Sequence, residues 1–218
     1  MTDSGILRDV QRYYEARLRE FGPTARGVDW NGTESQRLRF AQLLQVLEPA
    51  DRTGPVEILD VGCGYGALVE HLREQALAIR YVGYDISEEM LETAERLFGD
   101  SEERVRFVRE WEAVPPADVA VASGVFHVRL SYDESTWREY VLDSLRAIHQ
   151  KARSAWAANF LTIYSDEERM RPDLYYADPG FLFDWCKRHL AGEVAVLHDY
   201  GLYEFTLIIR RLARGRPR

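Results

Sequence analysis

The chain has 218 residues, of which 46% are hydrophobic and 29% charged, as expected for one globular domain with or without a small cap. Its apolar runs are shorter than the roughly 18 residues of a membrane helix, and its first residues do not resemble a signal peptide, so we expect a cytoplasmic protein without a membrane partner. Its two cysteines suggest neither disulfides nor a metal site, so we expect no metal. The formal net charge of −8 makes nucleic acid a poor partner, because an acidic surface repels phosphate backbones.

Residues 1–50 precede the first predicted strand, and we expect them to form a helical lid. Two helices are joined by the loop Gly22–Gly32, which holds three glycines, one proline and Trp30. Tyr13, Tyr14 and Trp30 could supply an apolar wall that excludes water from a ligand. The alternative is that these aromatic residues serve only core packing.

Apolar runs then alternate with helical patterns. The predicted strands are Val56–Val61, Ile79–Asp85, Val105–Val108, Asp118–Ser123 and Ala155–Leu161. The predicted helices are Ala67–Gln75, a helix capped by Ser87, Glu134–Gln150 and Gly180–His189. This alternation predicts an α/β fold with a parallel sheet between two layers of helices, a Rossmann-like α/β/α sandwich.

The last two apolar runs differ from the others. Val194–His198 and Phe205–Ile209 are separated by too few residues for a crossover helix. Parallel strands need a dozen or more connecting residues, so these two must pair as an antiparallel hairpin. We therefore expect a mostly parallel sheet of seven strands with an antiparallel last strand.

A glycine loop, ILDVGCGYG, ends the first strand and carries Gly62, Gly64 and Gly66. Glycines at this turn let the backbone approach a ligand, and Asp85, at the end of the next strand, can accept hydrogen bonds from ribose hydroxyls. Together they indicate a nucleoside cofactor. The alternatives are a packing role for the glycines with Asp85 merely flanking a helix, and a dinucleotide site, whose G-x-G-x-x-G/A spacing the loop also satisfies.

Asp60 argues against the dinucleotide. A dinucleotide loop offers backbone amides to a pyrophosphate, and a carboxylate two residues before Gly62 would repel it. A cationic ligand group suits Asp60 better. The terminal hairpin also stands where a second mononucleotide half would end, and the chain has only one such glycine loop.

The stretch LDVGCGYG followed by VGYDIS, residues 82–87, resembles the class I S-adenosylmethionine-dependent methyltransferases, including their stand-alone bacterial members. The resemblance implies that residues 51–218 form the S-adenosylmethionine-binding domain. In this family Asp60 would face the ammonium group of the methionine, Asp85 would hold the ribose and Ile86 would pack on the adenine. The remaining cofactor contacts that we expect are Gly62, Cys63, Gly64, Gly66, Ser123, Gly124, Trp30 and Arg39.

The family often has an acidic residue near the adenine amino group, after the third strand. Here that stretch is FVREWEAVP, residues 107–115. Either Glu110 bonds the adenine while Trp111 stacks on it, or the acidic contact is missing. Arg39 could pair with the carboxylate of the cofactor, although a surface role is an equal alternative.

The expected reaction is methyl transfer to an oxygen or nitrogen of a small molecule. His127 follows the fourth strand and is the candidate base, because imidazole titrates near neutral pH; its alternative is a structural role in the loop. The other expected substrate contacts are Tyr13, Tyr14, Phe126, Asn159, Tyr175 and Tyr176. An NAD-dependent oxidoreductase and a non-catalytic S-adenosylmethionine sensor or scaffold remain alternatives.

Overall fold

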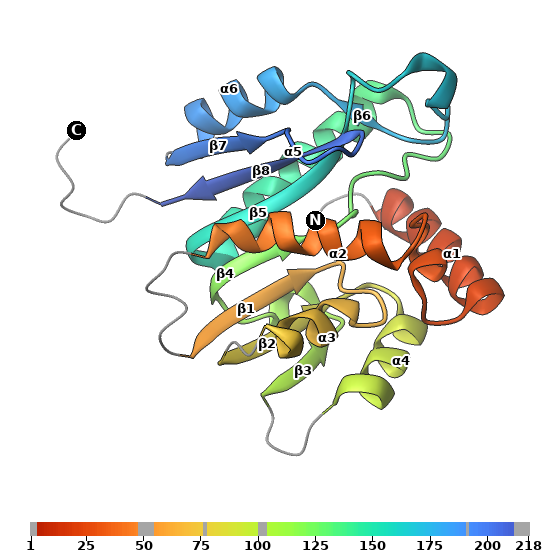
Figure 1. Ribbon diagram of the computed structural model, residues 1–218, viewed down its shortest axis with the longest axis vertical. Helices are drawn as coiled ribbons and strands as arrows, with labels where there is room; N and C mark the ends of the chain where they lie inside the picture. The colour runs from red at the N-terminus through yellow and green to blue at the C-terminus, as the bar shows by residue number, and fades with distance from the viewer. Residues whose placement is uncertain (1–3, 48–54, 76–77, 100–103, 191, 212–218) are drawn as a thin grey trace, which may run out of the picture.

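The computed structural model describes residues 4–47, 55–75, 78–99, 104–190 and 192–211, where an open sheet lies between helices (Figure 1). The strands are β1 (Val56–Val61), β2 (Ile79–Tyr84), β3 (Val105–Val108), β4 (Ala117–Ala122), β5 (Ala152–Thr162), β6 (Tyr176–Ala177), β7 (Glu193–Leu197) and β8 (Glu204–Arg210). The helices are α1 (Ser4–Phe21), α2 (Thr33–Leu43), α3 (Ala67–Glu74), α4 (Glu88–Phe98), α5 (Glu134–Lys151) and α6 (Pro179–His189). Short 3-10 turns are η1 (Ala25–Val28), η2 (Leu44–Val46), η4 (Trp111–Ala113) and η5 (Glu167–Arg169).

The strand order is β3-β2-β1-β4-β5-β8-β7, and β6 joins as an eighth strand beside β5. Strands β1 to β5 are parallel, while β8 runs antiparallel to both β5 and β7. This confirms the predicted mostly parallel sheet with an antiparallel last strand. The addition, β6, pairs only through Leu161 and Thr162 of β5, and a strand of two residues leaves no periodic pattern in a sequence.

Successive residues of the central strands enter different cores. In β1, Leu59 packs with residues of α5 and α6, whereas Ile58 packs with residues of α2 and α3. A sheet covered on both faces reads as a continuous apolar run, which is how β1 appears in the sequence. The three-layer arrangement follows from these two cores.

The N-terminal helices contribute to the same two cores. Ile6 and Val10 of α1 belong to the core of α5 and α6, and Phe40 and Leu43 of α2 belong to the other. The expected boundary between a lid, residues 1–50, and the sheet domain lies outside the described residues. That division of the chain stays a prediction.

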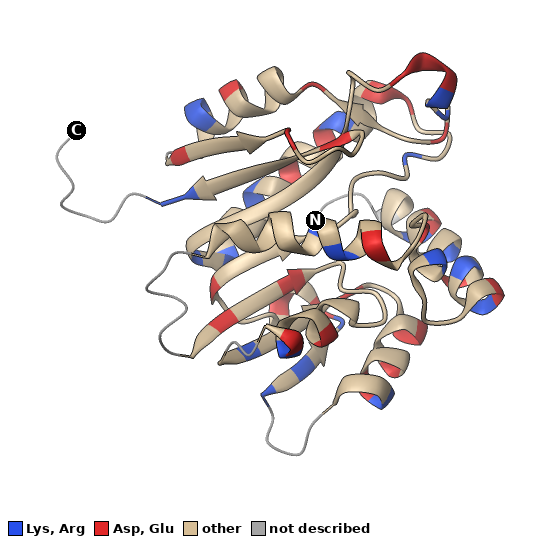
Figure 2. Cartoon of the chain, in the orientation of Figure 1, with Lys and Arg blue, Asp and Glu red and all other residues tan. Residues whose placement is uncertain are grey.

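The strand order reverses between β1 and β4, which is where open α/β sheets bind ligands, outside the carboxyl ends of the strands. Helix α1 lies beyond these ends (Figure 1). Charged residues gather on the helices and loops, and long uncharged stretches run along β5 and β8 (Figure 2). In the described part of the chain, every helix is too short or too polar to cross a membrane.

Candidate active site

All three glycines of the loop adopt the left-handed backbone conformation. The φ angles are 71° at Gly62, 54° at Gly64 and 84° at Gly66. A Cβ atom on Gly62 would lie 2.6 Å from Val125 Cγ2, and one on Gly66 would lie 2.9 Å from Phe98 Cδ2. Gly66 begins α3 and packs on Phe98, so its backbone serves the turn, whereas Gly62 and Gly64 border a cavity.

This first cavity opens at the carboxyl ends of β1, β2 and β4. The strand ends and the turns after them contribute Gly62, Gly64, Asp85, Ile86, Ser123 and Gly124. Helix α1 covers it with Val10, Gln11 and Tyr14. The walls are mostly apolar with a few polar groups, which is the usual character of a small-molecule site.

Asp85 holds the glycine loop. Its Oδ2 accepts a hydrogen bond from Gly64 N at 2.8 Å, and its Oδ1 accepts one from Ser87 N at 2.9 Å. Desolvation raises the pKa of Asp85, although the hydrogen bonds from Ser87 and Gly64 oppose that shift. Each carboxylate oxygen has lone-pair capacity left for a ligand hydroxyl.

A side chamber adjoins the first cavity and contains Asp60. It is lined by Gln36, Asp60, Cys63 and Tyr65, together with Gly62, Gly64, Ser123 and Trp30. Asp60 is 3% exposed and accepts a hydrogen bond from the Tyr81 hydroxyl at 2.7 Å. The described residues form no ion pair with Asp60, and burial raises its pKa to about 7. A cationic ligand group is what this carboxylate lacks.

Gln36 and Tyr65 were not predicted as site residues. Their side-chain amide and hydroxyl groups lie 3.5 Å apart, beside Asp60 in the chamber. Tyr65 could have been found from the sequence, because it stands between two of the loop glycines. Cys63 is also in the wall; burial raises the pKa of its thiol well above the usual value.

Ser123 and Gly124 form the turn that follows β4. The Ser123 hydroxyl is buried, lines both the first cavity and the side chamber, and has no hydrogen-bond partner among the described residues. Gly124 N donates to Asn159 Oδ1 at 2.8 Å. The hydroxyl is therefore free to bond a ligand, because unpaired buried polar groups are costly.

A second cavity lies on the other side of Trp30. It is lined by Arg39, His127, Arg169, Arg171, Tyr176 and Glu204. Its wall shares Tyr14, Val28 and Trp30 with the first cavity. The Trp30 ring lies 3.9 Å from the Arg39 guanidinium carbon and meets the His127 ring edge-on at 5.3 Å. Trp30 thus stands at the junction of the two cavities.

A buried polar chain runs from Arg39 to the turn after β4. Arg39 Nε donates to both oxygens of Glu204, at 2.8 and 2.9 Å, and Arg39 Nη2 donates to Glu204 Oε1. Asn159 Nδ2 donates to Glu204 Oε2 at 2.7 Å. Because the amide oxygen of Asn159 accepts from Gly124 N, Asn159 connects the second cavity with the first.

His127 lines the second cavity and is 5% exposed. Its Nε2 lies 3.3 Å from the Asn159 carbonyl oxygen. A carbonyl only accepts, so Nε2 carries the proton and Nδ1 has the lone pair in the neutral ring. Burial lowers the pKa of His127, which keeps the ring neutral at pH 7.

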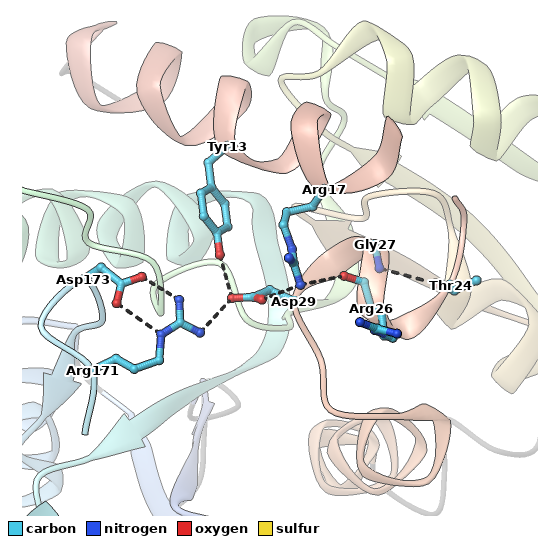
Figure 3. A network of polar contacts seen from close by, with 8 residues as sticks. All are labelled: Tyr13, Arg17, Thr24, Arg26, Gly27, Asp29, Arg171 and Asp173. Atoms are coloured by element: carbon cyan, nitrogen blue, oxygen red, sulfur yellow. Dashed lines mark hydrogen bonds and ion pairs between the residues drawn. The ribbon is translucent and has the colours of Figure 1, made fainter. Parts of the chain in front are cut away.

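Asp29 joins α1 to the loop between β5 and β6 (Figure 3). Its Oδ2 accepts from the Tyr13 hydroxyl at 2.8 Å and lies 3.5 Å from Arg171 Nη1, while its Oδ1 pairs with Arg17 Nη2 at 3.0 Å. Arg171 also forms a two-pronged pair with Asp173. These contacts hold α1, η1 and the later loop together beside the second cavity.

Several expected contacts lie away from the cavities. Glu110 is exposed ahead of η4, and the Trp111 ring packs edge-on against Tyr84 at 5.0 Å. Phe126 is in the core, stacked on Phe160 at 5.2 Å. Tyr84, Ile86 and Tyr140 line the first cavity instead of Glu110 and Trp111. The positions of Glu110, Trp111 and Phe126 therefore do not favour the ligand contacts expected of them.

The expected substrate tyrosines are divided. Tyr14 lines both cavities and Tyr176 lines the second. Tyr13 bonds Asp29 instead of lining a cavity, and Tyr175 is 4% exposed, with its N donating to the His127 carbonyl at 2.8 Å. Tyr13 and Tyr175 thus contact residues that line the second cavity, Asp29 and His127, without lining that cavity themselves.

Known proteins resemble both the sequence and the fold. Residues 59–151 match the family model of a methyltransferase domain. Rv1506c of Mycobacterium tuberculosis, named as a methyltransferase, is 41% identical over 168 residues, which cover 77% of this chain and 99% of that protein. Trans-aconitate 2-methyltransferase of Pseudomonas aeruginosa strain PAO1 is 35% identical over 102 residues, covering 45% of this chain and 37% of that protein.

Solved structures share the fold at low identity. The plantazolicin methyltransferase BpumL, in complex with SAH, has a TM-score of 0.60 and 14% identity, covering 94% of this chain and 98% of that one. Human N-acetylserotonin methyltransferase, in complex with SAM, has a TM-score of 0.56 and 15% identity, covering 96% of this chain and 68% of that one. The family model and the relative Rv1506c identify the chain as a methyltransferase. The chain belongs to the class I S-adenosylmethionine-dependent methyltransferases.

Proposed function

We propose that this enzyme transfers a methyl group to an oxygen or nitrogen of a small molecule held in the second cavity. The observation that carries the proposal is the shared wall: Tyr14, Val28 and Trp30 border both cavities. Because these residues border both cavities, ligands in the two cavities would adjoin beside them, as an in-line transfer between the ligands requires. The partial relatives named for trans-aconitate support a small acceptor.

The first cavity and its side chamber fit the cofactor. S-adenosylmethionine, when bound, supplies an activated methyl group on a cationic sulfur. Asp60, buried without an ion-pair partner among the described residues, would hold the ammonium group. Asp85 would accept the ribose hydroxyls, and the unpaired Ser123 hydroxyl supplies a further hydrogen bond.

His127 would take the proton of the acceptor. Its Nε2 is held by the Asn159 carbonyl, which leaves the lone pair on Nδ1, and its lowered pKa keeps that lone pair unprotonated at pH 7. A positioned base contributes about 10²–10⁴ to the rate of a proton-coupled step. The apolar wall around Trp30 would exclude water and align the acceptor.

Binding and turnover test the proposal separately. Isothermal titration calorimetry should show binding of S-adenosylhomocysteine, and Asp85→Ala should weaken it by about tenfold or more through the lost ribose hydrogen bonds. The matched control is Asp143→Ala, on the exposed face of α5. Undetectable binding by the parent, or equal affinity in Asp85→Ala, would rule out this cofactor site.

Turnover is then measured with S-adenosylmethionine and a metabolite extract, by following release of S-adenosylhomocysteine. His127→Ala should lower kcat about 10²–10⁴-fold while leaving the Kd of S-adenosylhomocysteine unchanged. Tight cofactor binding with no turnover on any fraction would instead favour a sensor or scaffold. Fluorescence enhancement of NADH on binding would favour the oxidoreductase alternative.

A further inference from the structure

One nitrogen of the Arg39 guanidinium is unmatched. The side chain is 7% exposed and lines the second cavity, yet its Nη1 has no hydrogen-bond partner among the described residues. Glu204 occupies the opposite edge of the same group, through Nε and Nη2. Leaving charged N–H groups buried and unpaired costs free energy, so a ligand oxygen at Nη1 would be strongly favoured.

The unmatched nitrogen is held in place from two directions. The Trp30 ring covers one face of the guanidinium at 3.9 Å, and Glu204 fixes its edge while Asn159 fixes Glu204. The donor is therefore rigid before any ligand arrives. A rigid planar donor loses little entropy on binding and suits a planar carboxylate.

Among the described residues, the guanidinium groups of the cavity wall are each paired with a carboxylate, apart from the free nitrogen of Arg39. The charged side chains of the wall are the guanidinium groups of Arg39, Arg169 and Arg171 and the carboxylates of Asp29 and Glu204. Arg171 and Arg169 are each approached by an acid that does not line the cavity, Asp173 at 2.6 Å and Asp166 at 3.8 Å. With these two acids counted, the guanidinium groups at the wall are balanced by carboxylates. The preference for an anion therefore rests on the Arg39 nitrogen that is unpaired among the described residues, which suits a single carboxylate oxygen.

We propose that the second cavity takes an acceptor that carries a carboxylate, and that Arg39 Nη1 binds that carboxylate. The inference rests on the proposed methyl transfer and names the class of its acceptor. It assigns Arg39 to the acceptor rather than to the carboxylate of the cofactor. Arg39 lines the second cavity, whereas the chamber that contains Asp60 is lined by Gln36, from the preceding turn of α2.

The test compares acids with their amides on the full chain. Benzoate, cinnamate and succinate are each titrated against their primary amides by ligand-observed NMR, with and without saturating S-adenosylhomocysteine. At least one acid should bind about tenfold or more tightly than its amide. Arg39→Lys, which keeps the charge but loses the fork, should remove that preference, and Arg37→Gln, on the exposed face of the same helix, should not.

The outcomes separate this inference from the proposed function. Amides binding as well as acids, or acids binding Arg39→Lys as well as the parent, would overturn it. If Arg39→Lys instead lost affinity for S-adenosylhomocysteine, Arg39 would be assigned to the cofactor and the inference would be overturned. Because breaking a buried ion pair can unfold a protein, the parent is also labelled with ¹⁵N-arginine, and the acid must shift the Arg39 side-chain signal. If S-adenosylhomocysteine does not bind at all, the methyl-transfer proposal is contradicted. The preference of the second cavity for acids over amides is then decided by the titrations without S-adenosylhomocysteine.

Discussion

Among single residues, Asp60 carries a cost for the fold, because its carboxyl group is buried without a cation beside it among the described residues. The carboxyl group is 3% exposed and its one described hydrogen bond comes from the Tyr81 hydroxyl. Burial raises its pKa from 3.8 to about 7, so the ligand-free protein carries a poorly solvated acid. A cation bound beside the carboxyl group would lower its pKa again.

The raised pKa predicts how stability depends on pH. Between pH 3.8 and about 7 the folded chain keeps a proton on Asp60 that the unfolded chain releases, so this group destabilises the fold as pH rises. Asp60→Asn does not titrate. Urea unfolding at pH 5 and pH 7.5 should therefore show the variant gaining stability relative to the parent at the higher pH. A difference between the two proteins that stays constant with pH would contradict the assignment.

At the scale of elements, the turn after β4 and the loop after η1 are fitted to each other. Gly124 has a φ of 75°, and a Cβ atom there would lie 2.4 Å from Trp30 Cζ2. The indole can reach the junction of the two cavities only because Gly124 has no side chain. The two segments are far apart in the sequence, and their contact contributes to the wall that the two cavities share.

Alanine substitution measures this fit. Gly201→Ala is the matched control, since its φ is 73° and no described atom lies within 4 Å of its Cβ position; it should cost about 1–2 kcal/mol for left-handed strain alone. Gly124→Ala should cost about 1–3 kcal/mol more, because Trp30 must move. Urea unfolding gives both values. The excess should shrink in a Trp30→Ala background, and an excess that persists there would place its cause elsewhere.

Across the whole molecule, Asp29 connects the N-terminal helix α1 with the loop between β5 and β6. Asp29 contacts α1 through Tyr13 and Arg17, and the β5–β6 loop through Arg171 (Figure 3). Helix α1 lines the first cavity, so we expect ligand exchange there to be faster when these contacts are weakened. Asp29 adopts a φ of 61°, a conformation that asparagine also tolerates.

Asp29→Asn therefore weakens these contacts without straining the backbone. Partly exposed ion pairs contribute about 0.2–1 kcal/mol each, so S-adenosylhomocysteine should dissociate about fivefold faster from the variant. Stopped-flow protein fluorescence measures the rate, with Asp143→Asn as the control. Equal dissociation rates would mean that the Asp29 contacts do not govern lid opening.

The strands, the terminal hairpin and the glycine loop could be predicted because their signals are local. A buried strand is a continuous apolar run, a hairpin is a short connection, and Gly62, Gly64 and Asp60 are neighbours in the chain. The adenine contacts expected from Glu110 and Trp111 rested on position in the chain alone. In the structure Trp111 packs against Tyr84, and Tyr140 lines the first cavity. The local sequence around these residues does not predict this arrangement.

The order of the elements, the sheet they form and the edge that carries the glycine loop could be inferred from the sequence alone, since hydrophobic periodicity and turn residues act over a few positions. The residues beyond Trp30 come together only through the tertiary fold. Arg39 and Glu204 are 165 residues apart, and they meet because β8 inserts beside β5 while α2 lies against the same face. A buried ion pair of that kind depends on the strand order, which is why the second cavity and its unmatched guanidinium nitrogen could be found only in the folded chain.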